Sequence, residues 1–236
     1  MKKQDDFSRY SRQIFIEEIG LEGQKKIRSS KVLVIGAGGL GSPVIQYLAA
    51  AGVGTLGVAD FDEVELHNLN RQIIHTENRV GVSKVKSAET FVRELNHQVK
   101  VIGIEEKINK ENAEEIISHY DVIVDGSDNF STRYLVNDTC VKLKKTLVYG
   151  SILGFFGQVA IFNHSGSKNL RDIFPEPPFD EDVPDCDSLG VLGALPGMIG
   201  SMMALQALKI ITDLPVIVNQ LTLVDTLNWR FQAIDF

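Results

Sequence analysis

The segment Gly36-Ala37-Gly38-Gly39-Leu40-Gly41 has the residue types and spacing to hold the phosphates of a nucleotide. It matches the pattern GxGxxG, directly after the apolar run 31–36 and at the start of a helix predicted over 40–51. Glycines let the backbone approach phosphate oxygens, and a helix start offers free N–H groups and a positive dipole. The alternative is a glycine-rich turn that binds no ligand.

Asp60 ends the next predicted strand, 55–60, about 20 positions after the glycine segment. A carboxylate in this place can accept hydrogen bonds from ribose hydroxyls. The glycine segment and Asp60 together predict a nucleotide site. They fit NAD as well as ATP, so the identity of the nucleotide depends on other residues.

Polar and cationic side chains follow Asp60 in a loop and at the next helix start: Asn68, Arg71, Gln72 and Lys84. A hydride-transfer enzyme needs a flat apolar slot for nicotinamide, whereas a reaction at phosphorus builds negative charge that fixed Arg and Lys groups stabilise. This set therefore favours ATP and a reaction at phosphorus. The alternative interpretation is a solvated charged loop.

Asp128 lies in the motif DGSDN, residues 125–129, directly after a predicted strand. A carboxylate at the carboxyl end of a central strand points into the crevice, where it can hold Mg²⁺ against phosphates. Asp is also favoured at helix N-caps, so capping of the next helix is an equal alternative.

The elements that must position these residues alternate along the first part of the chain. Predicted strands at 31–36, 55–60, 99–106, 121–126 and 146–150 alternate with predicted helices at 40–51, 83–95, after an N-cap at Asn109, and at 130–143. This alternation is typical of βαβ units and a parallel sheet, with the site outside the carboxyl ends of the strands. Strand-like residues at 152–163 follow without a helix, and a hairpin at 220–235 comes last.

The predicted fold class is α/β: a Rossmann-like mixed sheet, parallel in its N-terminal part and antiparallel afterwards, with helices on both faces. We expect one domain over residues 1–236, with a nucleotide-binding half at 1–150. The other half, 151–236, holds the antiparallel strands and a long loop at 164–189 rich in Pro, Asp and Glu. Loops of this length in a compact domain are usually functional or disordered.

Composition excludes some functions. Lys and Arg number 24 against 31 Asp and Glu, a net charge of -7, which argues against non-specific nucleic-acid binding. Residues 191–212 are apolar enough to span a bilayer, but Pro196 and three glycines favour a loop entering a buried helix, so no membrane is expected. The first residues lack the apolar region of a secretory signal, which predicts a cytoplasmic protein.

Several motifs occur together in one order: RYSRQ (9–13), GAGGLGSP (36–43), AGVGTLGVADFDEVELHNLNRQ (51–72), the VGVSK lysine, DGSDN (125–129) and CDSLGVLGALPGMIGS (186–201). From about Arg9 to Trp229 the chain resembles the ThiF/MoeB/HesA adenylyltransferases, bacterial relatives of ubiquitin-activating enzymes. The resemblance implies adenylylation, with ATP and Mg²⁺, of the C-terminal Gly-Gly carboxylate of a ubiquitin-like sulfur carrier protein.

The resemblance also assigns roles to residues. Arg71, Lys84 and Asp128 would act in catalysis, with Mg²⁺ on Asp128. Arg12 would enter the ATP site of the neighbouring subunit in a homodimer. The nucleotide would contact a larger set: Gly36, Gly38, Gly39, Gly41, Asp60, Asp62, Asn68, Arg71, Gln72, Lys84, Asp128 and Asn129.

The carrier and the sulfur source are further expectations. RYSRQ and GVGTLGVAD (52–60) are more similar to the thiamin-pathway member ThiF, with a ThiS-like carrier, than to MoeB, which activates the small subunit of molybdopterin synthase. MoeB-like activation is the alternative. No rhodanese-like segment follows, so a cysteine desulfurase or rhodanese-type partner is expected to supply sulfur.

Cys186 ends the acidic loop, in the place where family members can receive sulfur or carrier. A thiolate is a good nucleophile toward an acyl-adenylate. The nearby Asp182, Asp185 and Asp187 oppose ionisation of the Cys186 thiol, and a spare loop cysteine is the equal alternative. Cys140, in contrast, is expected in the core.

Many relatives carry two CxxC pairs for structural zinc. Here Asn169-Leu170-Arg171-Asp172 stands at the first pair, and the sequence ends at Phe236 before the second. We expect no zinc, with this loop held by Phe174, the prolines and the hairpin.

Two functions of other classes remain open from the sequence. An NAD-dependent oxidoreductase would bind nicotinamide and release no pyrophosphate. A non-catalytic nucleotide-binding scaffold would bind ATP without carrier-dependent turnover.

Overall fold

The structure is a computed structural model that describes residues 2–178 and 190–236, with side chains from residue 8 onward. Its centre is one sheet with the strand order β3-β2-β1-β4-β5-β6-β7-β8. The strands are β1 Lys31–Ile35, β2 Thr55–Ala59, β3 Lys100–Ile104, β4 Val122–Asp125, β5 Thr146–Leu153, β6 Phe156–Phe162, β7 Gln220–Asp225 and β8 Arg230–Asp235. The first five are parallel and the last three are antiparallel. The predicted mixed Rossmann-like sheet is confirmed.

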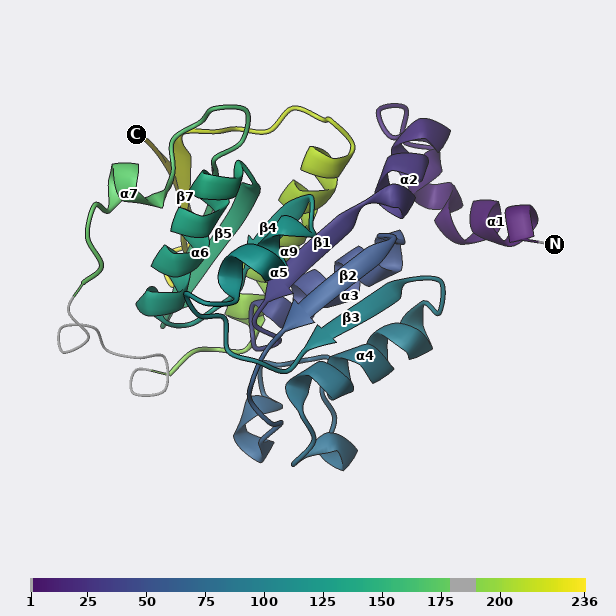
Figure 1. Cartoon of the computed structure of the whole chain (residues 1–236), viewed down its shortest axis with the longest axis horizontal. Helices are drawn as coiled ribbons and strands as arrows, with labels where there is room; N and C mark the ends of the chain where they lie inside the picture. Colours follow the sequence, from purple (N-terminus) through teal and green to yellow (C-terminus); the bar gives the residue numbers. More distant parts are fainter. Residues whose placement is uncertain (1, 179–189) are drawn as a thin grey trace.

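Helices cover both faces of the sheet (Figure 1). One face packs against α3 Gly41–Ala51, α4 Lys84–Leu95 and α9 Ala194–Ile211. The other face packs against α5 Ala113–Ser118, α6 Phe130–Leu143 and the short α7 Leu170–Ile173. The alternation is visible in β1, where Val32 and Val34 belong to the first core and Leu33 and Ile35 to the second. An apolar strand buried on both faces is what a parallel sheet requires.

The apolar helix α9 is a core element. It packs against α3 and against β4, β5 and β6, and a side chain at its Gly200 would collide with the Leu40 carbonyl. α9 is long and apolar enough to cross a membrane by length and composition alone. Length and composition do not separate a membrane span from an all-apolar helix in the core of a soluble protein. The packing of α9 against the sheet supports the interpretation as a buried core helix.

The chain begins with two helices at one end of the molecule (Figure 1). These are α1, Lys2–Ile14, and α2, Gly20–Ser29. Tyr10 anchors α1 because its hydroxyl accepts a hydrogen bond from Asn96 Nδ2 at 2.9 Å. The rest of α1 projects away from the sheet (Figure 1).

Two local predictions were wrong. The N-cap of α5 is Asn112, because Asn109 Oδ1 instead accepts the N–H groups of Glu111 and Asn112 and so closes the turn before the helix. The predicted strand 152–163 is divided, since Ile152 and Leu153 continue β5 and β6 starts only at Phe156. A tight turn at Gly154, with φ of +57°, reverses the chain between them.

Candidate functional site

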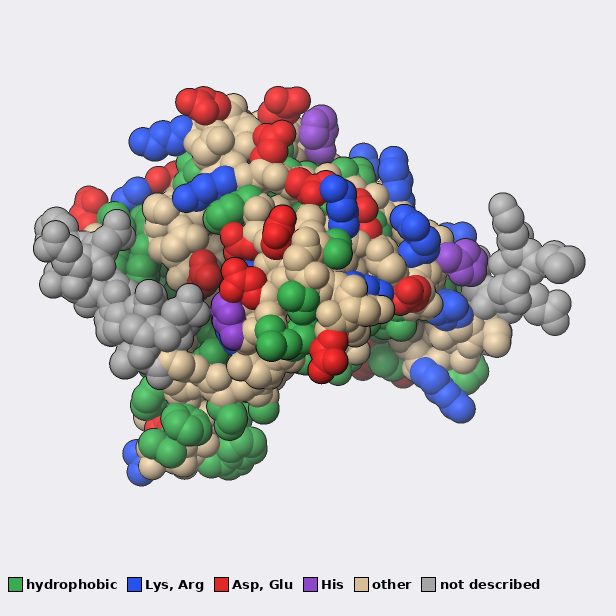
Figure 2. Space-filling model, turned by 90° about the horizontal axis from the view of Figure 1, so that it is seen from below, with side chains coloured by type: hydrophobic (Ala, Val, Ile, Leu, Met, Phe, Trp, Pro, Cys, Tyr) green, Lys and Arg blue, Asp and Glu red, His purple; other side chains and the backbone are tan. Residues whose placement is uncertain are grey.

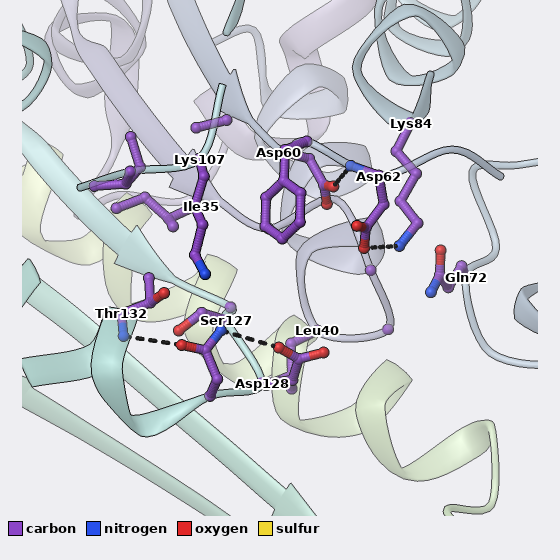
Figure 3. A pocket seen from close by; sticks show the side chains of 18 of the residues that line it. Ile35, Leu40, Asp60, Asp62, Gln72, Lys84, Lys107, Ser127, Asp128 and Thr132 are labelled. Atoms are coloured by element: carbon purple, nitrogen blue, oxygen red, sulfur yellow. Dashed lines mark hydrogen bonds and ion pairs between the residues drawn. The ribbon is translucent and has the colours of Figure 1, made fainter. Parts of the chain in front are cut away.

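A cavity of about 300 Å³ lies at the carboxyl ends of β1, β2 and β4. This is the edge where the sequence placed the site, since loops after parallel strands meet there. The cavity brings together ten of the predicted residues: Gly36, Gly38, Gly39, Asp60, Asp62, Arg71, Gln72, Lys84, Asp128 and Asn129. Figure 3 shows Lys84 and Gln72 on one side and Lys107 on the other.

The glycine segment forms a tight loop between β1 and α3. Gly36 has a φ of +87°, and a Cβ there would lie 2.8 Å from the Gly126 carbonyl oxygen. A Cβ on Gly41 would lie 1.8 Å from the Gly36 carbonyl oxygen. Gly41 allows α3 to approach the loop, and the glycines that line the cavity are Gly36, Gly38 and Gly39. A contact of Gly41 with phosphate stays a prediction.

Asp60 is fixed in place by two backbone N–H groups. Its Oδ2 accepts from Ala37 N at 2.7 Å and its Oδ1 from Asp62 N at 2.9 Å. Burial raises the pKa of the Asp60 carboxyl, and this effect outweighs the opposing attraction of Lys84. The carboxylate oxygens keep further lone pairs for donors such as ribose hydroxyls.

Lys84, the first residue of α4, is 7% exposed, and its Nζ lies 2.9 Å from Asp62 Oδ2 (Figure 3). Asp62 holds the ammonium at the cavity wall. The charge is thereby positioned before any ligand enters, which is the arrangement that stabilises developing negative charge.

Arg71 and Gln72 follow the short helix η1, Leu66–Asn68. Arg71 Nη1 donates to the His67 carbonyl at 3.0 Å and to Asn70 Oδ1 at 3.4 Å. Gln72 is 4% exposed, and its Oε1 has no hydrogen-bond partner within the described part of the chain. A buried amide oxygen without a partner beside a cavity is costly unless a ligand or water satisfies it.

The structure does not bring Asn68 to the cavity. Its Oδ1 accepts from Glu65 N at 3.0 Å, within a reciprocal cap of η1 that also uses the Glu65 side chain. The expected contact of Asn68 with the triphosphate stays a prediction. Asn68 shapes the loop that carries Arg71.

Asp128 extends into the cavity and does not cap α6. Asn129 is the N-cap, since its Oδ1 accepts from Thr132 N at 2.9 Å. Among the described residues, the bond that Asp128 Oδ1 accepts is a long one of 3.3 Å, from Asn129 Nδ2 (Figure 3). The structure thus removes the capping alternative. The exposed carboxylate fits Mg²⁺, which is usually bound through one or two carboxylates together with phosphates and water.

The loop before Asp128 is held by a buried cation. Arg133 is 4% exposed and donates to the Ser127 carbonyl at 2.7 Å and to the Gly150 carbonyl at 3.1 Å. Its guanidinium also lies 5.1 Å from the centre of the Tyr149 ring. The Ser127 N–H donates to the buried Asp125 at 2.9 Å. Burial raises the pKa of Asp125, and Arg133 opposes this rise.

Sequence reasoning missed other residues of the cavity wall. Among them are Phe61, Lys107, Ser127, Thr132, Arg133, Ile152 and Val191. Lys107 Nζ lies 5.6 Å from the centre of the Phe61 ring. No pattern marks Lys107, because it follows β3 in a charged stretch; Arg133 could have been found as a cation on a helix that follows the DGSDN motif.

A model of the ThiF family matches residues 10–236. The chain belongs to the ThiF family. Among curated relatives, the adenylyltransferase and sulfurtransferase MOCS3 of Culex quinquefasciatus is 50% identical over 207 residues, or 88% of this chain and 47% of that protein. The protein of the same name from Xenopus laevis is 48% identical over 97% of this chain and 51% of its own length. This ThiF-family chain therefore spans about half the length of these relatives.

Solved structures share the fold. The Escherichia coli MccB structure with ATP has a TM-score of 0.84 at 20% identity, over 96% of this chain and 71% of that one. PaaA has a TM-score of 0.84 at 22% identity, over 98% of this chain and 73% of its own. At these identities the likeness supports the fold of the ThiF-family chain and no more.

The remaining predicted residues of this ThiF-family chain lie away from the cavity. Arg12 is exposed on α1 and does not line the cavity. Cys186 lies outside the described residues. Cys140 is buried in α6, as predicted, and burial raises the pKa of its thiol.

The segment in place of the first CxxC pair is tied to α6. Asn169 caps α7, Arg171 forms an ion pair with Asp138 at 2.8 Å, and the Tyr134 hydroxyl donates to the Phe174 carbonyl at 2.9 Å. The expectation that Phe174, the prolines and the hairpin hold this loop is corrected, because the side chains of α6 make the principal contacts. Within residues 2–178 and 190–236, no group of three or more His, Cys, Asp or Glu could hold a metal ion.

Proposed function

We propose that this chain uses ATP to adenylylate the C-terminal Gly-Gly carboxylate of a ubiquitin-like sulfur carrier protein. One observation carries the proposal: Arg71 and Lys84 line the same cavity as the glycine loop. A nucleotide seated on the glycine loop and Asp60 places its phosphates toward these cations. Two cations at this place suit a reaction at phosphorus better than a hydride transfer, which gains nothing from them.

In the proposed reaction, a carboxylate oxygen of the carrier attacks the α-phosphorus of ATP. The bond between the α-phosphorus and the oxygen bridging to the β-phosphate breaks, and pyrophosphate leaves with that electron pair. The product is a carrier acyl-adenylate. Arg71 and Lys84 stabilise the charge on the non-bridging oxygens and on pyrophosphate. Asp128 is the residue that would hold Mg²⁺, which neutralises phosphate charge when bound.

The comparisons favour one carrier class over the other. The curated relatives are named adenylyltransferase and sulfurtransferase MOCS3, and three of them are 48% to 50% identical to this chain over the aligned residues. These names support the MoeB-like alternative better than the thiamin reading drawn from RYSRQ and residues 52–60. We therefore propose a carrier of the molybdopterin-synthase small-subunit class in place of a ThiS-like carrier. Sulfur transfer itself is a separate proposal, because the chain spans only about half of these relatives.

A protein substrate needs a docking surface beside the cavity, and the closing hairpin of β7 and β8 has features of such a surface. Trp229 is 70% exposed and stacks edge-to-face on Phe231. The hairpin is joined to the cavity wall, because Thr226 donates to the Phe155 carbonyl and Gly154 pairs with the cavity residue Val191. Figure 2 shows hydrophobic side chains gathered at one corner of the molecule. Exposed apolar surface of this kind suits a partner.

Arg12 and the dimer belong to the same proposal. An exposed arginine on a projecting helix can reach a second copy, and Leu21 and Leu205 are exposed apolar residues that a partner subunit would cover. Arg12→Ala mixed with Asp128→Ala tests this, because one site of a mixed dimer is then intact. Partial recovery of activity supports the shared site, and no recovery removes the role of Arg12 across the dimer.

The proposed function is tested by exchange of labelled pyrophosphate into ATP, measured without carrier and with carriers of the two classes ending in Gly-Gly. The proposal predicts exchange that requires a carrier and is fastest with the molybdopterin-synthase type. Preference for the thiamin type would reinstate the earlier reading. Binding of NAD without any exchange would replace the proposal by an oxidoreductase, and ATP binding without exchange would leave a scaffold.

A further inference from the structure

His75 is a buried side chain beneath the glycine loop that the proposed chemistry does not use. It is 4% exposed and lies between η1 and the short helix η2, Glu77–Arg79. Its Nε2 lies 2.9 Å from the Ala37 carbonyl oxygen and its Nδ1 lies 2.7 Å from Ser87 Oγ. Both ring nitrogens are therefore engaged.

The two partners define which ring nitrogen carries the proton. A carbonyl oxygen can only accept, so Nε2–H must donate to Ala37. In the neutral ring Nδ1 is then an acceptor, and the Ser87 hydroxyl donates to it. Burial, together with the smaller effects of the cations Lys84 and Arg79, lowers the pKa of His75 to about 4 against the opposing effect of the hydrogen bond to Ala37, so the ring stays neutral at pH 7.

The hydrogen bond to Ala37 decides where the next N–H points. In a trans peptide the Ala37 carbonyl and the Gly38 N–H lie in one plane and point in opposite directions. Because His75 holds the carbonyl on the buried side, the Gly38 N–H faces the opposite way, and Gly38 lines the cavity. Within the described residues this N–H donates to no protein group. It is left for a ligand.

Ala37 is held from a second direction, since its own N–H donates to Asp60 at 2.7 Å. The loop needs such fixing because glycines leave its backbone many conformations. Ser87 lies on α4, the helix whose first residue is Lys84. His75 thus connects the loop to the helix that carries a phosphate-binding cation.

We propose that His75 is a positioning residue for the nucleotide: it holds the Ala37 carbonyl and so aims the Gly38 N–H at a phosphate oxygen. Ser87 Oγ donates to Nδ1 of the tautomer that the Ala37 carbonyl requires and so helps to hold the ring in place. The inference rests on the proposed function only in taking a nucleotide phosphate as the ligand. It involves no contact between His75 and the substrate.

The test compares Mg·ATP binding by calorimetry, without carrier, in wild type, His75→Asn, His75→Gln and the exposed control His97→Gln. A Gln amide can reach the position of Nε2, whereas an Asn amide reaches only that of Nδ1. We expect His75→Asn to raise the Kd about tenfold, the loss of about one buried hydrogen bond, and His75→Gln to restore most of the affinity. His97→Gln should leave the Kd unchanged.

A purely structural role would lower the melting temperature of His75→Asn but leave its Kd at the wild-type value, and that result overturns the inference. Nitrogen-15 spectra of the histidines in the wild-type protein give a second readout, which does not depend on whether a variant folds. They should show His75 protonated at Nε2; protonation at Nδ1 overturns the inference. If wild type binds ATP but never turns over with a carrier, the proposed function fails while the role of His75 stands.

Discussion

Replacement of Arg133 by methionine should greatly lower the free energy of unfolding, because it leaves buried groups without partners. Arg133 satisfies the Ser127 and Gly150 carbonyls, and its charge opposes the rise in the pKa of the buried Asp125. Removing one member of a buried charged set costs roughly 3–5 kcal/mol. A domain is stable by only about 5–15 kcal/mol, so this loss is a large share of the total.

The pH dependence of this loss has a definite sign. Burial already raises the pKa of Asp125 above 3.8, so the folded state binds a proton more readily than the unfolded state. The free energy of unfolding therefore falls as pH rises from about 3.8 through the folded-state pKa. Without Arg133 that pKa rises further, and the deficit of Arg133→Met should be larger at pH 8 than at pH 5.

Urea unfolding of the single variants Arg133→Met and Asp125→Asn and of the double variant measures the coupling directly. Asp125→Asn keeps an oxygen for the Ser127 N–H and removes the charge, so the double variant should be more stable than the sum of the single losses by about 1 kcal/mol or more. The reasoning would be refuted by additive losses, or by a loss below about 1 kcal/mol in Arg133→Met.

Three further predictions concern the loop, the helices and the hairpin. Between pH 6.5 and about 4, His75 is protonated in the unfolded state but not in the folded state. The free energy of unfolding, measured in urea titrations, should therefore fall by up to about 3 kcal/mol as the pH is lowered from 6.5 to about 4. A fall of the same size in His75→Gln would contradict this. Gly41→Ala should cost about 3 kcal/mol or more in thermal unfolding, because its Cβ meets the Gly36 carbonyl. The matched control Gly197→Ala has open space in a helix and should be neutral or stabilising by up to about 1 kcal/mol; equal effects would remove the packing argument. Trp229→Ser should raise the KM for the carrier about tenfold and leave the KM for ATP unchanged in exchange assays, and an unchanged carrier KM would exclude the hairpin as the docking surface.

The sequence predicted the elements that carry strong local signals. The apolar run before Gly36 predicted β1, and the alternation of strands and helices predicted the parallel half of the sheet. Asn109 misled because Asn112 lies three residues later in the same polar turn. Local capping preferences do not separate two such candidates.

The candidate site was predicted where a motif places a residue directly at a strand end. Asp60 and Asp128 are of this kind, and both line the cavity. Asn68 caps η1 and does not line the cavity, an arrangement that no motif in the sequence indicates. His75 was missed because it acts on the Ala37 carbonyl, 38 positions away in the sequence, which only the folded chain brings near.

A crystal structure with a non-hydrolysable ATP analogue tests the central claim most directly. The account predicts the ribose on Asp60, phosphate oxygens on the Gly38 N–H, and Arg71 and Lys84 in contact with the triphosphate. Phosphates bound elsewhere, with both cations directed into solvent, would contradict it.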